Sequence, residues 1–423
     1  MNSGRSFRLA YVTLAVLSSV NLINFLDRQV IAALAPTIKD YWHLTDAQVG
    51  LLGTAFEVLY ALAPVPIAIL SDRWLRRKVI TLAIVVWSGA MAISGAAVSY
   101  WMLLFGRAAL GLGEAGYAPS AMAWLSDVFP STYRSRVVGL HDLGVMLGSA
   151  AGYALGGALG RALGWRPVFY IAALPGFILA VMVWLLPEPA KGQSDYQALG
   201  AESKTAHTPA ISATTAVKQL LSVPTLLVVY VAGTLVSFAI GGLTYWLPSF
   251  AVRTHGFSEN EAGFLIGAVT VLTGAAGVLS GGFLADRLIR HTPSGRLLTI
   301  GASFVAGVPL ALIAISVPGQ TLFIVLAALA MCLFAFYSPC MGPLVHQVTH
   351  PSLRATATAF YLFIIHILGY ATGPAVVGWF SDQTGDLWWG MAVALLVALV
   401  GGLVGLWGAR FVERDAQRMI TRL

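Results

Sequence analysis

The 423 residues are 58% hydrophobic and only 10% charged, and their mean hydropathy is +0.79. Soluble domains carry about 25% charged residues because their surfaces face water, so this composition excludes a soluble protein. Two cysteines, Cys332 and Cys340, are too few for a disulfide framework or a zinc site. The net charge of +7 alone is compatible with a nucleic-acid partner and with a membrane protein. The positions of the basic residues along the chain distinguish the two.

Apolar runs of about 20 residues, the length that spans a bilayer, recur along the whole chain. The first run is longer than the h-region of a signal peptide and no small-residue cleavage site follows it, so we expect it to be a helix. The sequence predicts an all-α membrane protein with twelve transmembrane helices, at 9–36, 47–70, 79–98, 101–126, 135–160, 166–186, 222–250, 260–285, 297–317, 320–346, 355–381 and 387–410.

A polar stretch at 188–220 divides the chain in half. It predicts an N-terminal six-helix bundle over 1–187, a cytoplasmic linker over 188–220 and a C-terminal six-helix bundle over 221–423. With both termini in the cytoplasm, nineteen of the 25 Lys and Arg residues fall on the cytoplasmic side and four on the opposite side, and two lie inside helices. This strong positive-inside bias supports that orientation. The excess charge therefore sets topology, and we expect no nucleic-acid partner.

The two halves repeat each other at an offset of about 214–220 residues. The segment Ser71-Asp72-Arg73 matches Ala285-Asp286-Arg287, and Tyr117-Ala-Pro119 matches Tyr337-Ser-Pro339. Further down each half, Gly152-Tyr153 resembles Gly369-Tyr370. Two parallel six-helix repeats predict pseudo-symmetric bundles, a substrate site near the midplane and alternating access by rocking.

The acidic and basic loop Ser71-Asp72-Arg73-Trp-Leu-Arg76-Arg77-Lys78 is similar to the cytoplasmic signature of the major facilitator superfamily. Asn24-Phe-Leu-Asp27-Arg28, the run from Gly106-Arg107 to Glu114, and Glu188-Pro-Ala-Lys191-Gly192 most resemble its Spinster branch. The resemblance covers essentially the whole chain. It implies a proton-linked transporter of amphipathic molecules, whose animal members move sphingosine phosphate or lysophospholipids. The Asp-Arg pair and the Arg-to-Glu spacing also resemble symporters of sugar acids, and Glu57 departs from the Spinster pattern.

Four acids, Asp27, Glu57, Glu114 and Asp142, and two arginines, Arg28 and Arg107, are predicted to lie within the membrane. Ionisable groups at this depth usually line a cavity or a proton route, although a buried ion pair that only fixes helix packing is the alternative. Arg107 and Glu114 are seven residues apart and project from one helix face.

Asp27 and Glu114 are the predicted proton-coupling pair. Arg107, which can form a bidentate pair with a carboxylate or phosphate, is expected to alternate between Glu114 and an anionic substrate group. Arg28 is either a second anchor or a residue that faces a polar neighbour. Asp142 and His141 are weaker candidates because they can pair locally near the cytoplasm, and His366 and His346 are more simply explained as hydrogen-bonded helix residues.

The second half carries Phe334 at the repeat position of Glu114. A cavity with one ionic wall and one aromatic wall suits an amphiphile, although any single aromatic is as well explained by packing or by contact with lipid. The full set of predicted substrate-binding residues is Arg107, Arg28, Glu57, Tyr117, Phe238, Tyr245, Trp246, Phe334, Tyr337, Tyr361, His366 and Tyr370.

Charged residues at the cytoplasmic helix ends form a predicted gate. An ion pair between Asp72 and the Arg134/Arg136 pair would hold the outward-open state, although a topogenic charge cluster is the alternative. The full set of predicted gating residues is Asp72, Arg73, Arg134, Arg136, Asp286 and Arg287.

Other functional classes lack their motifs. Gly111-Leu-Gly113-Glu-Ala-Gly116 fits the dinucleotide pattern, but no strand is predicted before it. The P-loop and H-E-x-x-H patterns are absent from the sequence, so we expect neither an enzyme nor a primary pump, no metal site, and no cofactor apart from protons as the coupling ion.

The sequence thus predicts a proton-coupled transporter of a lipid-like anion or zwitterion. A sugar-acid symporter is the alternative, and a non-transporting receptor is more remote. We expect a monomer in a bacterial inner membrane, with the lipid bilayer and a small amphipathic or organic anion as its partners.

Overall fold

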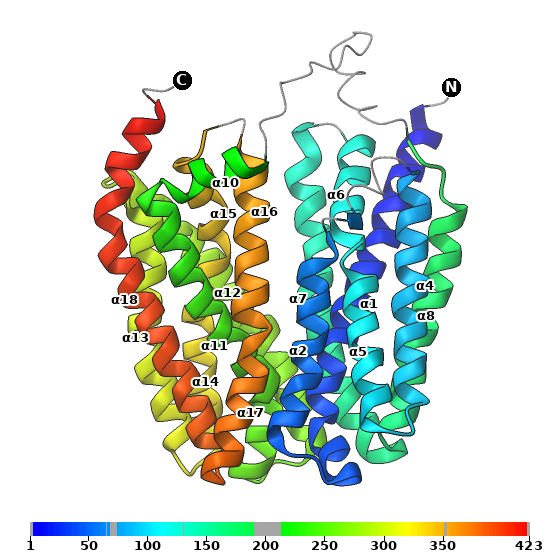
Figure 1. The fold of residues 1–423 in the computed structure, drawn as a ribbon. Helices are drawn as coiled ribbons and strands as arrows, with labels where there is room; N and C mark the ends of the chain where they lie inside the picture. Colours follow the sequence, from blue (N-terminus) through cyan, green and yellow to red (C-terminus); the bar gives the residue numbers. More distant parts are fainter. Residues whose placement is uncertain are drawn as a thin grey trace. The chain divides into compact units, whose positions relative to one another are not determined.

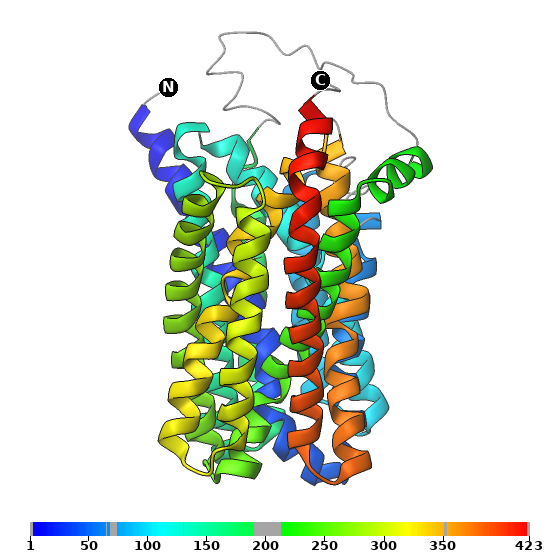
Figure 2. The ribbon, with the colours of Figure 1, turned by 90° about the vertical axis from the view of Figure 1, so that its left-hand side faces the viewer.

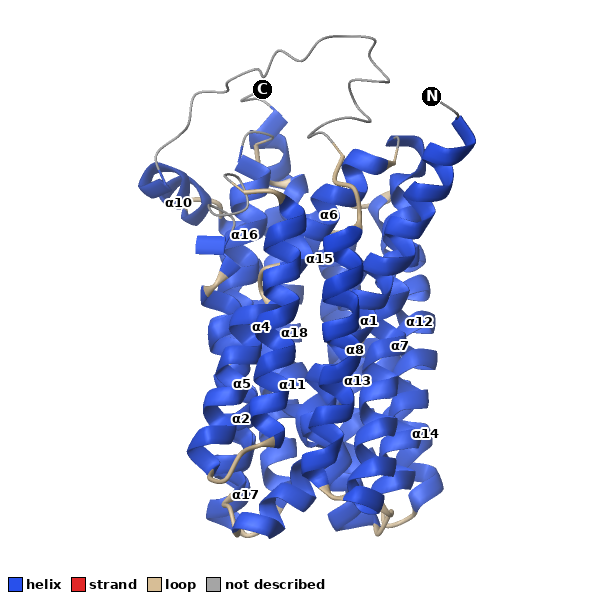
Figure 3. Cartoon of the chain, turned by 90° about the vertical axis from the view of Figure 1, so that its right-hand side faces the viewer, coloured by secondary structure: helices blue, strands red, loops and turns tan. Residues whose placement is uncertain are grey.

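The computed structural model describes residues 3–64, 66–67, 74–129, 131–189, 213–350 and 353–420. Every regular element in this part of the chain is helical, and no strand occurs in it (Figure 3). Ten helices among these residues are long and apolar enough to cross a membrane. The shorter α2 and the broken pair α5–α6 occupy the places of the two remaining predicted spans. The all-α membrane fold is therefore confirmed, while the segment at 190–212 of the predicted linker lies outside the described residues.

The helices follow the predicted order. In the first half they are α1 (Ser3–Trp42), α2 (Asp46–Leu62), α4 (Arg76–Gly95), α5 (Tyr100–Glu114), α6 (Tyr117–Val128), α7 (Ser131–Leu163) and α8 (Trp165–Leu185) (Figure 1). In the second half they are α10 (Ala213–Leu221), α11 (Pro224–His255), α12 (Glu259–Ile289), α13 (Gly295–Ser316), α14 (Gln320–Phe334), α15 (Tyr337–Gln347), α16 (Arg354–Ile364), the π-helical η2 (Ile365–Tyr370), α17 (Thr372–Thr384) and α18 (Leu387–Ile420).

The chain forms two compact units, and each unit includes a short piece from the other half. Unit 1 comprises Met1–His43, Ala55–Thr208 and Glu259–Gly267. Unit 2 comprises Leu44–Thr54, Pro209–Ser258 and Ala268–Leu423. The exchanged pieces, Leu44–Thr54 and Glu259–Gly267, contain the first turns of α2 and α12. They are the corresponding helices of the two repeats.

Two helices break at the same repeat position. One predicted span divides into α5 and α6 at Ala115–Gly116, and another divides into α14 and α15 at Ala335–Phe336. Pro119 and Pro339 lack a backbone N–H, so they cannot donate to the carbonyls of Ala115 and Ala335 four residues earlier. The Tyr-x-Pro repeat therefore explains both breaks, and it sets Glu114 and Phe334 at the last turn of the helix before each break.

Unit 1 is held together by a glycine-lined contact between α1 and α7. Cβ atoms added at Gly144, Gly148 or Gly152 of α7 would collide with the backbone of α1 at Ser18, Leu22 or Leu26. Small residues at such positions allow two membrane helices to approach closely. This glycine row therefore serves the close packing of α1 and α7. In unit 2, α18 packs along α11 and α13 (Figure 2).

We expect Gly148→Ala to destabilise the protein by about 1–3 kcal/mol, the usual cost of overpacking, because its methyl group would meet the backbone of Leu22. Gly139→Ala is the matched control on the same helix. A Cβ there meets nothing within 4 Å, and alanine favours a helix over glycine. Thermal unfolding in detergent should show a lower Tm for Gly148→Ala and an equal or higher Tm for Gly139→Ala. Equal losses in both variants would contradict the close α1–α7 contact.

Candidate functional site

Helices α1 and α5 bring four of the predicted ionisable residues into the interior of unit 1. The Arg28 Nε atom donates to Glu114 Oε2 at 2.6 Å, and the Glu114 side chain is fully buried. The sequence placed Glu114 opposite Arg107 on its own helix. In the structure its hydrogen-bonded partner is Arg28 of α1, and whether Arg28 also anchors substrate stays a prediction.

Asp27 and Arg107 form the deeper part of the same cluster. Asp27 is 0% exposed and Arg107 is 1% exposed. Arg107 interacts electrostatically with Asp27 and Glu114, and its Nη1 lies 3.5 Å from the Asp27 carbonyl oxygen. Neither carboxyl oxygen of Asp27 has a hydrogen-bond partner among the described residues. An ionised carboxylate without donors is costly to bury, so this site favours a carboxyl that carries a proton.

Glu57 and the aromatic rings of Phe25, Phe56 and Tyr60 complete the surroundings of Arg28. Glu57 of α2 interacts electrostatically with Arg28 and Glu114. The Arg28 guanidinium carbon lies 4.2 Å from the ring centroid of Tyr60 and 4.7 Å from that of Phe25. Cation–π contacts of this kind stabilise a poorly hydrated guanidinium. The cluster of Asp27, Arg28, Glu57, Arg107 and Glu114 is called the charge cluster below.

Tyr117 begins α6, directly after the helix break. Its ring is 1% exposed, and its hydroxyl donates to the Leu17 carbonyl and contacts His141 Nε2. His141 is also buried, whereas the side chain of the adjacent Asp142 is 57% exposed. Tyr117 was predicted to bind substrate and His141 to be a minor candidate, and the structure joins the two in one buried network.

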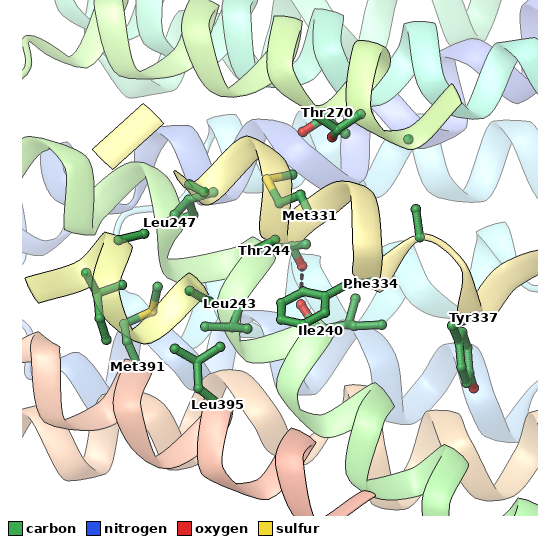
Figure 4. A pocket seen from close by; sticks show the side chains of 18 of the residues that line it. Ile240, Leu243, Thr244, Leu247, Thr270, Met331, Phe334, Tyr337, Met391 and Leu395 are labelled. Carbon is green, nitrogen blue, oxygen red and sulfur yellow. Dashed lines mark hydrogen bonds between the residues drawn. The ribbon is translucent and has the colours of Figure 1, made fainter. Parts of the chain in front are cut away.

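Unit 2 contains an apolar cavity of about 300 Å³. Its wall comes from α11, α12, α13, α14, α15, η2 and α18, and Figure 4 shows its labelled side chains gathered around the end of α14. Phe334, Tyr337 and Tyr370, three of the predicted aromatic residues, line it. None of the lining residues is charged. The polar groups in the wall include Thr244, whose hydroxyl is already bonded to the Ile240 carbonyl.

The other predicted aromatic residues of unit 2 do not line this cavity. Tyr361 is 4% exposed and hydrogen-bonds to Tyr337. Tyr245 donates to the Val49 carbonyl at 2.6 Å and Trp246 donates to the Pro374 carbonyl at 2.8 Å. His366 packs on Tyr370 with ring centroids 5.0 Å apart, and Phe238 is half-buried on α11. Their predicted contact with substrate stays a prediction.

Sequence reasoning missed a cluster of polar contacts around the exchanged segment Leu44–Thr54 of unit 2. Asp46 accepts two hydrogen bonds from Arg253 Nη1, both at 2.9 Å, and one from Ser381 Oγ at 2.6 Å. The Asp382 carboxylate accepts the backbone N–H groups of Asp46 and Ala47 at 2.7 Å each and so caps α2. We call these contacts of Asp46 and Ala47 with α11 and α17 the outer clamp. Asp46 and Asp382 are 336 residues apart, and no local sequence pattern predicts the hydrogen bond from the Asp46 backbone to the Asp382 carboxylate.

The side chains of half of the predicted gating residues lie outside what the structure describes. Asp72 and Arg73 lie outside the described residues, as does the Arg134 side chain, while Arg136, Asp286 and Arg287 are exposed. The nearby contacts that the structure shows are different ones. Arg76 forms an ion pair with Asp127, and Glu188 accepts the backbone N–H groups of Arg76 and Arg77 at the start of α4. Glu188 therefore caps a helix, a role that its sequence alone did not indicate.

The described residues contain neither a metal-ligand cluster nor the strand–turn–helix context of a nucleotide site. No group of three or more His, Cys, Asp or Glu side chains within the described ranges is placed to hold a metal ion. The glycine pattern Gly111–Gly116 spans the end of α5 and the turn that follows it. A dinucleotide fingerprint requires a strand before the glycines, so its rejection from the sequence agrees with the structure.

The chain belongs to the Major Facilitator Superfamily, whose family model matches residues 17–367. Among its relatives, an MFS-type efflux pump of Mycolicibacterium smegmatis is 31% identical, over 94% of this chain and 92% of that protein. Protein spinster homolog 3 of Danio rerio is 29% identical, over 97% of this chain and 87% of that protein.

Within the superfamily the chain is a transporter of the Spinster type, and not an enzyme. A crystal structure of a bacterial homologue of the human lysosomal transporter Spinster, inward-facing and unoccupied, matches it with a TM-score of 0.87 and 25% sequence identity. The match covers 96% of this chain and 98% of that one. The resemblance read from the Asp27-Arg28, Arg107-to-Glu114 and Glu188 segments is thereby confirmed at the level of the branch.

Proposed function

We propose that this protein is a proton-coupled secondary transporter of an amphipathic, anionic or zwitterionic, lipid-like substrate of the lysophospholipid or sphingoid-phosphate type. The observation that carries the proposal is the charge cluster, with Asp27 and Glu114 as the proton-binding carboxyls. It lies on α1, α2 and α5 of a Spinster-type chain, and its central ion pair is buried.

The charge balance of the cluster supports proton binding. Its three carboxyl groups face two guanidinium groups, so the fully ionised cluster carries a net charge of −1 in a poorly hydrated site. One proton makes the cluster neutral, and the unpartnered carboxyl of Asp27 is well suited to take it. An arriving anionic head group would instead compete with Glu114 for an arginine, because guanidinium binds carboxylate and phosphate in the same geometry. Substrate and proton are thus coupled through the same two arginines.

The cavity of unit 2 supports an apolar moiety in the substrate. Ligand sites are typically about 300–1,000 Å³, so a cavity of about 300 Å³ suits part of a ligand, such as an alkyl tail. A sugar acid would need hydrogen-bonding groups on every side, and the uncharged wall of this cavity offers few. For this reason we place the sugar-acid symporter second. A receptor that does not transport is the third candidate.

The test is flux in proteoliposomes that contain a pH-sensitive dye. The probes are a lysophospholipid, a sphingoid phosphate and galactonate, added one at a time at matched concentration. We expect the lipid probes to change internal pH and galactonate to leave it unchanged. Movement of galactonate with protons, and of neither lipid, would replace the proposal with the symporter alternative. Movement of lipid without any change of internal pH would contradict the proposed proton coupling.

We expect Gly274→Leu to reduce transport of a long-chain lysophospholipid at least tenfold. Gly274 lines the cavity, and a Cβ there meets nothing within 4 Å, so the new side chain extends into the cavity without displacing backbone. Gly342→Leu on α15 is the matched control, since it also has open space but does not line the cavity. Initial rates for probes of increasing chain length would show the loss growing with length. Equal rates in both variants would mean that the tail binds elsewhere.

We further propose that the protein acts as a monomer in a bacterial inner membrane, with both termini in the cytoplasm and protons as its only coupling ion. The orientation rests on the positive-inside bias. Single cysteines near each terminus, probed with an impermeant reagent in intact and opened cells, would test it.

A further inference from the structure

A set of three hydrogen-bonded residues occurs at matching repeat positions in the two units. In unit 1, Tyr117 of α6 contacts His141 of α7, 24 residues away, and donates to Leu17 of α1, 100 residues away. In unit 2, Tyr337 contacts Tyr361 at the same separation of 24 and Ser237 at the same separation of 100. Both tyrosines begin the helix that follows a break. The arrangement is therefore duplicated, with two chemical differences: unit 1 has a histidine where unit 2 has a tyrosine, and the Leu17 backbone carbonyl where unit 2 has the Ser237 hydroxyl.

The hydrogen bonds of the Tyr117 hydroxyl determine that Nε2 of His141 carries a hydrogen. The Tyr117 hydroxyl donates its only proton to the Leu17 carbonyl. The contact of 2.9 Å between Tyr117 Oη and His141 Nε2 must then be a donation from the imidazole. Nε2 carries a hydrogen in both charge states, so any titration of this ring takes place at Nδ1.

Nδ1 has one suitable partner for each of its two states. The Asn21 amide nitrogen, a donor, lies 3.3 Å away and also donates to the His141 carbonyl at 2.9 Å. This partner satisfies an unprotonated Nδ1. The Asp142 carboxylate, an acceptor, also lies 3.3 Å away and satisfies a protonated Nδ1. Because Asp142 is 57% exposed and His141 is 2% exposed, the carboxylate also connects the buried ring with water.

Among the other elements packed against α7, α6 carries the charged residue Asp127, which is already paired with Arg76. The described charged residue of α8, Arg166, lies on the rings of Tyr41 and Trp165, beyond the far end of α7. The exchanged segment of α12 meets α7 at Ala150 and Gly157, at least two turns from His141, and its Glu259 accepts a hydrogen bond from Thr37. Asn21, Tyr117 and Asp142 are thus the polar groups that decide the state of His141.

We infer that His141, together with Asn21, Tyr117 and Asp142, forms a second proton-binding site in unit 1, separate from the charge cluster and without a counterpart in unit 2. A proton from water binds Nδ1, the Nδ1–H group turns to Asp142, and the hydrogen bond from Asn21 to Nδ1 is lost. Asn21 lies six residues before Asp27 on α1. Proton binding here therefore loosens α1 from α7 less than two turns from the charge cluster.

The experiment uses the full-length protein in nanodiscs with isotope-labelled histidine. NMR follows its eight histidines across about pH 5 to 8, where imidazole changes charge, and the signal missing from H141Q identifies His141. We expect this signal to titrate. D142N, which removes the partner of the charged form, should move its midpoint to lower pH, and N21A, which removes the partner of the neutral form, should move it to higher pH. Each shift should be about 1 pH unit.

The repeat supplies the control, because Y361F alters the equivalent residue of unit 2 and should leave the His141 titration unchanged. A His141 signal that does not titrate, or that moves in the same direction in D142N and N21A, would overturn the inference. The measurement needs no substrate, so its result is separate from the fate of the proposed transport function. A histidine with only a structural role would not show opposite shifts in the two variants.

Discussion

Glu114→Gln is expected to abolish substrate-driven proton movement while leaving substrate exchange measurable. The amide oxygen can still accept the hydrogen bond from Arg28 Nε, which measures 2.6 Å to the native carboxylate, but an amide cannot carry the proton. Without the charge of Glu114, two carboxyls face two guanidiniums and the cluster is neutral without a proton. In dye-loaded proteoliposomes we expect the pH signal to fall at least tenfold, whereas counterflow of labelled substrate persists.

Asp27→Asn separates proton binding from ion pairing, because Asp27 is fully buried and outside the Arg28–Glu114 pair. We expect the same loss of proton movement in this variant. Glu413→Gln, at an exposed position of α18, is the control and should behave like the native protein. Acidification at the native rate in the Glu114→Gln protein would show that the carboxyl does not carry the coupled proton. Loss of counterflow as well would mean that the residue serves only to hold α1 and α5 together.

Arg253→Ala is expected to release the exchanged segment Leu44–Thr54 from α11 and α17. The Asp46 side chain is 5% exposed and that of Arg253 is 27% exposed. Removing one partner of such a hydrogen-bonded charge pair costs about 2–5 kcal/mol, much of it from the charge left behind. We expect the proposed alternating access to break these contacts, so the strength of the clamp would limit how often the segment detaches.

A single cysteine in place of Val49 reports on that release, because Val49 is 0% exposed and its carbonyl accepts the hydrogen bond from Tyr245. Cys332 and Cys340 are first replaced by alanine. In nanodiscs we expect a maleimide to label Cys at position 49 at least tenfold faster in the Arg253→Ala background, since about 1.4 kcal/mol corresponds to a tenfold change in population. Glu259→Gln, in the corresponding piece of unit 1, keeps a neutral contact with Thr37 and should change the rate less than about twofold. An unchanged labelling rate in the Arg253→Ala background would show that the outer clamp does not control detachment of the segment.

The fold could be predicted well because each membrane helix is recognisable from its own local sequence. A run of about 20 apolar residues needs no partner to be recognised, and the breaks after Glu114 and Phe334 follow from Pro119 and Pro339. The family resemblance likewise rests on short contiguous segments. The membership of the charge cluster was also predictable, since an ionisable group in an apolar helix stands out.

What the sequence could not supply is pairing between distant segments. Arg107 looked like the partner of Glu114 because they share a helix face, yet Arg28 approaches from α1, and only the packing of α1 against its neighbours decides between them. The outer clamp joins Asp46 to residues more than 200 positions away, and each of its members resembles an ordinary helix end. The His141 network was visible only as two adjacent polar residues until Asn21 and Tyr117 were seen to surround the ring.

The exchanged segments also impose an order on biogenesis. Chains are synthesised at about 5–20 residues per second, so the 336 residues between Asp46 and Asp382 take about 20–70 s to make. During that time the first turn of α2 lacks the carboxylate that caps it and the arginine that neutralises Asp46. Unit 1 likewise waits for Glu259–Gly267 to reach α7. The first half is therefore incomplete when its last helix leaves the ribosome, and the first turn of α2 stays without its partners until α11 and α17 of the second half are made.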